Sequence, residues 1–219
     1  MATYKLKVQS NFWKVFVPKI ILILFVCFFP AINIGALEHK QVFEKILDKL
    51  SGVNTLKIKF KLVKSIYSGT LIVDLTGRYR IEFKKDSKTE RIVVSNGRKV
   101  WNYSPFEKKV VISSIETDEP AGLPNFFAQI SKDFVSISYT KELSSEAGSN
   151  YILKIKSNST NRIVKIFLTD KLDIKGVEFE NDGMTEFYKI LKIEYNPRIK
   201  ESFFEFKVPR GIEIIDLSN

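Results

Sequence analysis

Cysteine and histidine are almost absent from this chain. Its 219 residues include one cysteine, Cys27, and one histidine, His39. Nucleophilic groups of the Ser-His-Asp or Cys-His type need a positioned imidazole, and zinc sites favour histidine and cysteine ligands. The composition therefore argues against these forms of catalysis, and we expect no metal and no cofactor.

Glycine is also scarce, and the ten glycines occur singly, most of them at expected turns. No glycine-rich phosphate loop follows a strand and opens a helix, so nucleotide binding has no support. Carboxylate chemistry stays formally open, because Glu178, Glu180 and Asp182 alternate onto one face of an expected strand. A solvated sheet face beside lysine-bearing strands explains them more simply. We therefore expect a protein that is not an enzyme.

Residues 1–36 differ from the rest of the chain. Four lysines and no acidic residue precede the apolar run Ile20–Phe29, and the small residues Gly35 and Ala36 follow. This layout is typical of a secretory signal peptide, here cleaved after Ala36, and Cys27 lies too deep in the run for lipid attachment. The alternative is an uncleaved anchor, since counting on to Leu37 approaches the ~20 residues of a membrane span. We expect export to the periplasm.

The chain without this leader keeps a moderate positive charge. The formal net charge is +10, of which the leader lysines supply four, leaving +6. Lys57, Lys59 and Lys61 alternate with apolar residues instead of forming a run. That spacing indicates a solvated sheet face and not a nucleic-acid footprint.

Periodicity predicts a helix over 38–50 and, from Thr55, a strand with one apolar and one wet face. Asn96-Gly97 predicts a two-residue type I′ hairpin turn, which needs positive φ at both positions. Residues 116–134 break the alternation, with a loop leading into a short helix. The remaining expected strands cover 66–73, 78–83, 91–95, 99–103, 107–113, 135–143, 151–156, 162–169, 175–180, 187–195 and 202–207.

Consecutive short strands without βαβ alternation predict an antiparallel meander. The fold class is thus mainly β with α, a single domain over 37–219 built as an unclosed half-barrel. Bulky residues on its inner face could fill the interior or could leave an apolar cavity. Periodicity cannot separate these two alternatives.

Residues 91–106 carry a resemblance to a known family. Their apolar strand, Ser-Asn-Gly turn and Trp-Asn-Tyr-Ser-Pro closely resemble the outer-membrane lipoprotein carrier (LolA) family. The segments 77–83 and 204–211 fall in the family's order, so the resemblance covers essentially the whole chain after the leader. One departure is Leu75-Thr76, where family carriers often have an Arg-Pro pair whose arginine latches a lid.

The resemblance implies a LolA/LolB-like half-barrel whose helical lid covers an apolar cavity for lipoprotein acyl chains. The lid would span 124–134. The resemblance places the following residues in the cavity: Leu56, Ile58, Phe60, Tyr79, Ile81, Phe83 and Trp101. It places these residues on the lid: Leu123, Phe126, Phe127 and Ile130.

The resemblance also implies partners. These are acylated lipoproteins, an inner-membrane ABC-type lipoprotein-releasing complex and an outer-membrane acceptor, which in the family is often of the LolB type. The carrier itself would be a monomer that binds no nucleic acid. The alternative function is a LolA-like periplasmic sensor or scaffold that binds a protein partner and has a fully packed interior.

Overall fold

The computed structural model describes residues 34–74, 76–115, 122–144, 147–181 and 184–218. The chain divides into two compact units, Met1–Ile34 and Gly35–Asn219, and the second is described below. Nearly all of the expected signal peptide, including Cys27, lies outside the described residues. In the described part of the chain, no helix combines the length and apolar character that crossing a membrane requires.

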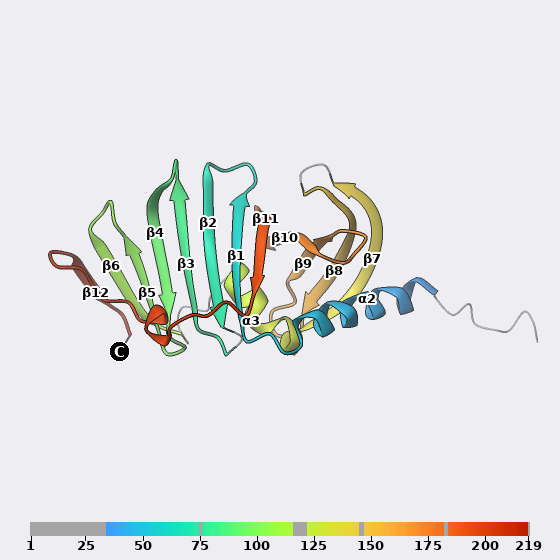
Figure 1. Ribbon diagram of the computed structural model, residues 1–219, viewed down its shortest axis with the longest axis horizontal. Coiled ribbons are helices and arrows are strands. Elements are labelled where there is room, and N and C mark those ends of the chain that lie inside the picture. Colours follow the sequence, from blue (N-terminus) through green and yellow to red (C-terminus); the bar gives the residue numbers. More distant parts are fainter. Residues whose placement is uncertain (1–33, 75, 116–121, 145–146, 182–183, 219) are drawn as a thin grey trace, which may run out of the picture. The chain divides into compact units, whose positions relative to one another are not determined.

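One 12-stranded sheet forms the body of the second unit (Figure 1). The strand order is β12-β6-β5-β4-β3-β2-β1-β11-β10-β9-β8-β7, so the sheet is unclosed, with edges at β12 and β7. Neighbours pair antiparallel, except β12 and β6, which run parallel. The strands are β1 (Thr55–Leu62), β2 (Tyr67–Asp74), β3 (Tyr79–Lys85), β4 (Lys88–Ser95), β5 (Lys99–Ser104), β6 (Lys109–Ser114), β7 (Phe134–Ser144), β8 (Ser149–Ser157), β9 (Ile163–Leu168), β10 (Ile174–Asn181), β11 (Met184–Tyr195) and β12 (Glu213–Asp216). This confirms the predicted antiparallel half-barrel.

Two helices pack into the core on the inner, concave face of the sheet. Helix α2 (Ile34–Leu50) confirms the helix predicted over 38–50, and its buried face includes Phe43 and Ile46. Helix α3 (Leu123–Asp133) begins at Gly122, whose φ of 80° suits glycine, and has a proline in its first turn. Both helices therefore bury apolar stripes against the alternating inner residues of the strands.

Gly69 on β2 allows two aromatic rings to meet across the sheet. A Cβ atom there would lie 2.4 Å from the Glu82 carbonyl oxygen and 2.5 Å from Cζ of Phe60. The strand pairing places Gly69 between Phe60 and Phe83, whose ring centroids are 5.8 Å apart. The glycine thus makes room for the Phe60 ring against Phe83.

The turn between β4 and β5 differs from the predicted type I′ turn. Gly97 has positive φ, but Asn96 is not among the residues with positive φ, and Ser95 pairs with Val100. The Asn96 side-chain oxygen instead accepts hydrogen bonds from the backbone nitrogens of Arg98 and Lys99, each at 3.0 Å. The side chain thus organises a longer loop over residues 96–98.

The predicted strand over 202–207 is wrong. Residues Glu201–Phe204 form a short 3-10 helix, η1, and the last strand is β12, beyond it. The Arg78 guanidinium lies 5.1 Å from the Phe204 ring centroid, and Arg80 lies 5.0 Å from the ring of Phe203. Phe203 and Phe204 therefore pack onto Arg80 of β3 and onto Arg78, which precedes β3. They do not join a hydrogen-bonded strand pair.

Asp74 ties the β2–β3 turn together. Its carboxylate accepts a 2.6 Å hydrogen bond from the backbone nitrogen of Thr76 and a 2.7 Å bond from Arg78. Burial alone would raise the pKa of Asp74, but these hydrogen bonds and the charge of Arg78 outweigh it and lower the pKa below its ordinary value. The folded state therefore favours the ionised carboxylate.

Replacing Asp74 with asparagine is expected to lower the free energy of unfolding at pH 7 by about 1–2 kcal/mol, because a charge-assisted hydrogen bond is lost. A lowered folded pKa contributes stability above the unfolded pKa and loses it as pH falls through the folded value. Urea unfolding at several pH values should show the difference between wild type and variant intact at pH 6 to 7 and shrinking below about pH 4. A pH-independent difference would contradict this assignment.

Candidate functional site

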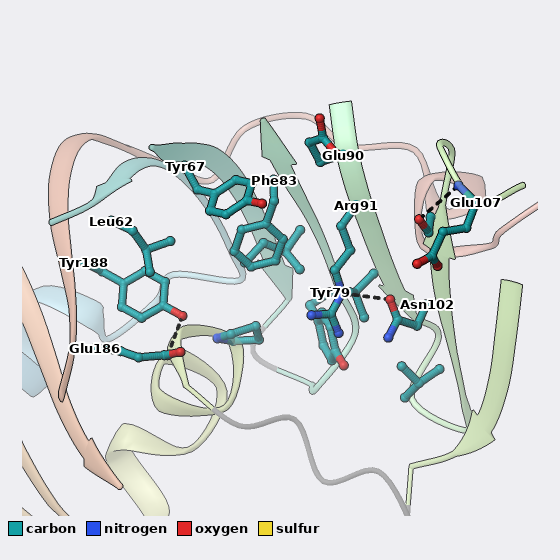
Figure 2. A pocket seen from close by; sticks show the side chains of 15 residues that line it. Leu62, Tyr67, Tyr79, Phe83, Glu90, Arg91, Asn102, Glu107, Glu186 and Tyr188 are labelled. Carbon is teal, nitrogen blue, oxygen red and sulfur yellow. Dashed lines mark hydrogen bonds between the residues drawn. The ribbon is translucent and has the colours of Figure 1, made fainter. Parts of the chain in front are cut away.

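A cleft of ≈ 720 Å³ opens on the concave face over β3, β4 and β5 (Figure 2). Pro124 at the start of α3 and two residues of β11 border it on the other side. The lining residues are Leu62, Tyr67, Tyr79, Ile81, Phe83, Glu90, Arg91, Val93, Val100, Asn102, Ser104, Glu107, Pro124, Glu186 and Tyr188. The cleft is therefore formed mainly by β3, β4 and β5, with the start of α3 at its border.

Strand register builds the apolar floor of the cleft. Ile81 of β3 lies directly opposite Val93 of β4, and Val93 lies opposite Asn102 of β5. Residues opposite each other in an antiparallel pair share a face, so alternate positions on all three strands point into the cleft. Tyr79 and Val100 complete the floor and are almost fully buried.

Polar side chains lie among the apolar ones. The Arg91 Nε donates a 2.8 Å hydrogen bond to the side-chain oxygen of Asn102, and the Tyr188 hydroxyl donates to Glu186 at 3.0 Å. Burial, followed by the nearby Glu186 carboxylate, raises the pKa of Tyr188 well above its ordinary value. The phenol is therefore a neutral hydrogen-bond donor at physiological pH, and Figure 2 shows it directed at Glu186.

The composition of the cleft is suited to binding a ligand, because apolar and polar side chains line it together. His39 lies on α2 and contacts Ser136 of β7, away from the residues that line the cleft. Within the described ranges, no three histidine, cysteine, aspartate or glutamate side chains gather as a metal site. An apolar floor with a few polar groups is the usual composition of a ligand pocket.

The predicted cavity residues divide into two groups. Tyr79, Ile81 and Phe83 line the cleft. Leu56, Ile58 and Phe60 face the same concave side but are completely buried and do not line the cleft, although Tyr79 and Ile81 belong to the same core cluster. Alternation thus gave their face correctly, while complete burial in the core keeps this second group out of the cleft.

Trp101 does not face the cleft, contrary to expectation. Its neighbours Val100 and Asn102 line the cleft, and successive residues of a strand point to opposite faces. Trp101 also pairs with Val94, the neighbour of the cleft residue Val93. The physical reason is the β4–β5 register, which directs the small Val100 inward and the large aromatic residue outward.

The predicted lid residues belong to a packed helix. Leu123, Phe126, Phe127 and Ile130 are all at most 2% exposed. The Phe126 ring lies 4.9 Å from Phe127 and 6.0 Å from Phe179 of β10, in edge-to-face contacts. Helix α3 therefore fills part of the concavity and leaves the cleft beside it. Leu75, at the position of the expected arginine latch, lies outside the described residues.

Several cleft residues were missed by the sequence analysis. Arg91, Asn102, Glu186 and Tyr188 are polar or come from distant strands, and a search for large apolar inner residues passes over them. The parity of β4 and β5 offered a signal, because placing Val93 inward places Asn102 inward as well. The contribution of β11 depends on long-range pairing with β1, which local sequence does not reveal.

Comparison with known proteins adds a family to this geometry. The family model described as outer membrane lipoprotein carrier protein LolA matches residues 51–207. An outer-membrane lipoprotein carrier protein of Pasteurella multocida is 28% identical over 185 residues, covering 78% of this chain and 85% of its own length. A protein with the same description from Pseudomonas aeruginosa is 26% identical and covers 86% of this chain and 96% of its own.

A solved structure shares the fold at low sequence identity. It is an uncharacterized conserved protein from Thermus thermophilus, with a TM-score of 0.50 and 14% identity. The match covers 79% of this chain and 98% of the other. This likeness concerns the arrangement of the sheet and helices alone.

Proposed function

Because this chain belongs to the outer-membrane lipoprotein carrier family, LolA, we propose that it shields the acyl chains of lipoproteins in the cleft over β3, β4 and β5. The family is one of carriers, not of enzymes. The single observation that carries the proposal is the apolar floor of Tyr79, Ile81, Val93 and Val100 beneath an open cleft. Each methylene buried there gains roughly 0.8 kcal/mol.

The polar groups of the cleft suit the polar end of an acylated ligand. Arg91 and Asn102 present side-chain donors next to the floor, and ester or amide carbonyls of a lipid anchor accept hydrogen bonds. A buried carbonyl without a partner would oppose binding. The combination supports a ligand with long apolar chains and acceptor groups near one end.

The proposed route crosses the periplasm. The carrier would be exported by its leader, with cleavage after Ala36. It would receive cargo from an inner-membrane ABC-type lipoprotein-releasing complex and deliver it to an outer-membrane acceptor. Intact mass measurement of the protein released from the periplasm tests the leader directly, and a mass that includes residues 1–36 would contradict cleavage.

Transfer from membranes tests the carrier role. The purified protein is incubated with membranes that contain the releasing complex, ATP and an acylated lipoprotein. We expect soluble, ATP-dependent lipoprotein bound to the carrier, while a form of the same lipoprotein without its acylated cysteine gives no complex. Failure to acquire acylated lipoprotein under these conditions would overturn the proposed function.

A second candidate is a sensor or scaffold that binds a protein partner. The complete burial of Leu56, Ile58 and Phe60 favours it, because this part of the concave face is packed by the protein's own side chains. In the transfer experiment this alternative predicts no bound lipoprotein. It also predicts that a substitution that fills the cleft beside α3 has no effect on binding of the protein partner.

A further inference from the structure

Three hairpin turns lie side by side at one end of the strands of the sheet. In a meander, alternate turns fall at the same ends of the strands, which brings together the β1–β2, β3–β4 and β5–β6 turns (Figure 1). We call this group of turns the rim, defined by residues 61–66, 84–88 and 105–109. Its three turns come from separate hairpins and are presented side by side.

Two large apolar side chains stand exposed on the rim. Phe106 in the β5–β6 turn is 88% exposed, the largest value among the exposed large apolar side chains in the described ranges. Ile66 in the β1–β2 turn is 59% exposed. Exposed apolar residues are common on surfaces, but a nearly free phenylalanine at a hairpin tip contributes nothing to the core that would explain it.

Lysines surround both apolar tips. Lys61, Lys64 and Lys189 line a shallow depression together with Ile66, and Lys61 lies opposite Lys189 across β1 and β11. Like charges directly opposite each other destabilise a sheet. The other rim lysines are Lys84, Lys85, Lys88, Lys108 and Lys109, and in the described part of the chain none of the rim lysines or Lys189 forms an ion pair.

Acidic residues on the rim are few. Asp86 lies in the β3–β4 turn, and Glu107 lies in the β5–β6 turn, where it also lines the cleft. Neither forms an ion pair with a rim lysine within the described ranges. The rim residues therefore include seven lysines and two acidic residues, and Glu213 of β12 lies opposite Lys109, which leaves an excess of positive charge around two apolar points.

The cleft extends to the end of the strands that carries the rim. Residues next to all three turns line it, with their side chains on the inner face. In Figure 2, Tyr67 and Phe83 lie together on this side of the cleft, with Glu90 nearby. The cleft-lining residues beside the turns are Leu62, Tyr67, Phe83, Glu90, Ser104 and Glu107. Whatever covers the rim therefore lies beside one end of the cleft.

We propose that the rim docks on the surface of an anionic phospholipid bilayer, with Phe106 and Ile66 inserted among the headgroups and the rim lysines against lipid phosphates. Isolated apolar anchors flanked by lysine match a membrane interface, where ammonium groups stay hydrated at headgroup level. A protein interface suits this surface less well, because lysine is depleted there and the two apolar points form no continuous patch. Docking in this orientation brings one end of the cleft to the lipid surface.

Vesicle flotation tests this proposal without any cargo. The protein released from the periplasm by osmotic shock is mixed with vesicles of phosphatidylglycerol and phosphatidylethanolamine, or of phosphatidylcholine alone. We expect flotation with the anionic vesicles only, decreasing as salt is raised from 50 to 500 mM because surface charges are screened. Absence of binding to the anionic vesicles would overturn the proposal.

Variants locate the binding surface. The double substitution Ile66→Ser, Phe106→Ser is expected to reduce the bound fraction at least about tenfold, since both apolar anchors are lost. The matched control, Leu191→Ser, Leu217→Ser, removes two aliphatic side chains that are 57% and 60% exposed away from the rim and should bind as wild type. Equal bound fractions for the two double variants would overturn the proposal, whether both fractions match wild type or both are reduced.

The charge variant Lys64→Gln, Lys108→Gln is expected to weaken anionic binding and to flatten its salt dependence. An unchanged salt dependence would contradict the assigned role of the rim lysines. Thermal unfolding by circular dichroism monitors the fold of each variant, and all of these positions are outside the core cluster. Because flotation uses no lipoprotein, its result is independent of whether the cleft carries acyl chains.

Discussion

Replacing Val93 with tryptophan is expected to weaken binding of a fluorescent palmitoylated peptide by about a hundredfold. Val93 lies on the cleft floor, opposite Ile81 and Asn102 in neighbouring strands. An indole at this position occupies space that an acyl chain would fill. Displacing about four methylenes removes roughly 3 kcal/mol at ~0.8 kcal/mol each, and 1.4 kcal/mol is a factor of ten in affinity. Fluorescence titration measures the change.

The matched control introduces the same side chain away from the cleft. Leu191 is 57% exposed, and Leu191→Trp should leave peptide binding within about twofold of wild type, because surface substitutions away from a site have small effects. Circular dichroism melting of both variants separates lost binding from lost folding. Equal affinities for wild type and the Val93→Trp variant would place the acyl chain elsewhere.

Replacing Phe126 with alanine is expected to lower the free energy of unfolding by about 3–5 kcal/mol. Phe126 is 1% exposed and makes edge-to-face contacts with Phe127, Phe134 and Phe179. Its removal leaves a cavity between α3 and the sheet, together with the loss of these ring contacts. Urea unfolding followed by tryptophan fluorescence measures the loss.

The size of this loss distinguishes a core helix from a loosely held lid. A cost of several kcal/mol means that α3 is a core element, so cargo enters beside it and a complete opening of α3 carries a comparable cost. A cost below about 1 kcal/mol would indicate a loosely held lid that contributes little to stability. The control Phe106→Ala removes the same ring from a position that is 88% exposed and should cost less than about 0.5 kcal/mol.

Local pattern predicted the architecture because it is built from alternation. Leu56, Ile58 and Phe60 alternate with lysines, and a strand turns such residues to opposite faces whatever surrounds it. The antiparallel order followed from short strands and tight turns. The helix over 38–50 was equally accessible, since its apolar positions recur at helical spacing.

The extent of the cleft could not be predicted because it depends on contacts between distant segments. Packing between distant segments encloses Phe60 in the core and leaves Tyr79 at the border of the cleft, although both have inward side chains. The family resemblance placed Trp101 in the cavity, whereas the register with β4 directs it to the opposite face. Phe203 and Phe204 pack onto Arg80 and Arg78, which are distant in the sequence. Local spacing alone therefore could not distinguish a strand from the short 3-10 helix.

Site-specific photo-crosslinking tests the central claim, that acyl chains lie on the concave face over β3 to β5. Benzoylphenylalanine replaces Phe83, which lines the cleft, or Trp101, which faces the other side of the sheet, in cells that produce acylated lipoproteins. Irradiation and mass spectrometry then identify what each position contacts. The carrier assignment predicts lipoprotein acyl chains linked at position 83 and none at position 101. Acyl chains linked only at 101, or no lipoprotein at either position, would contradict it.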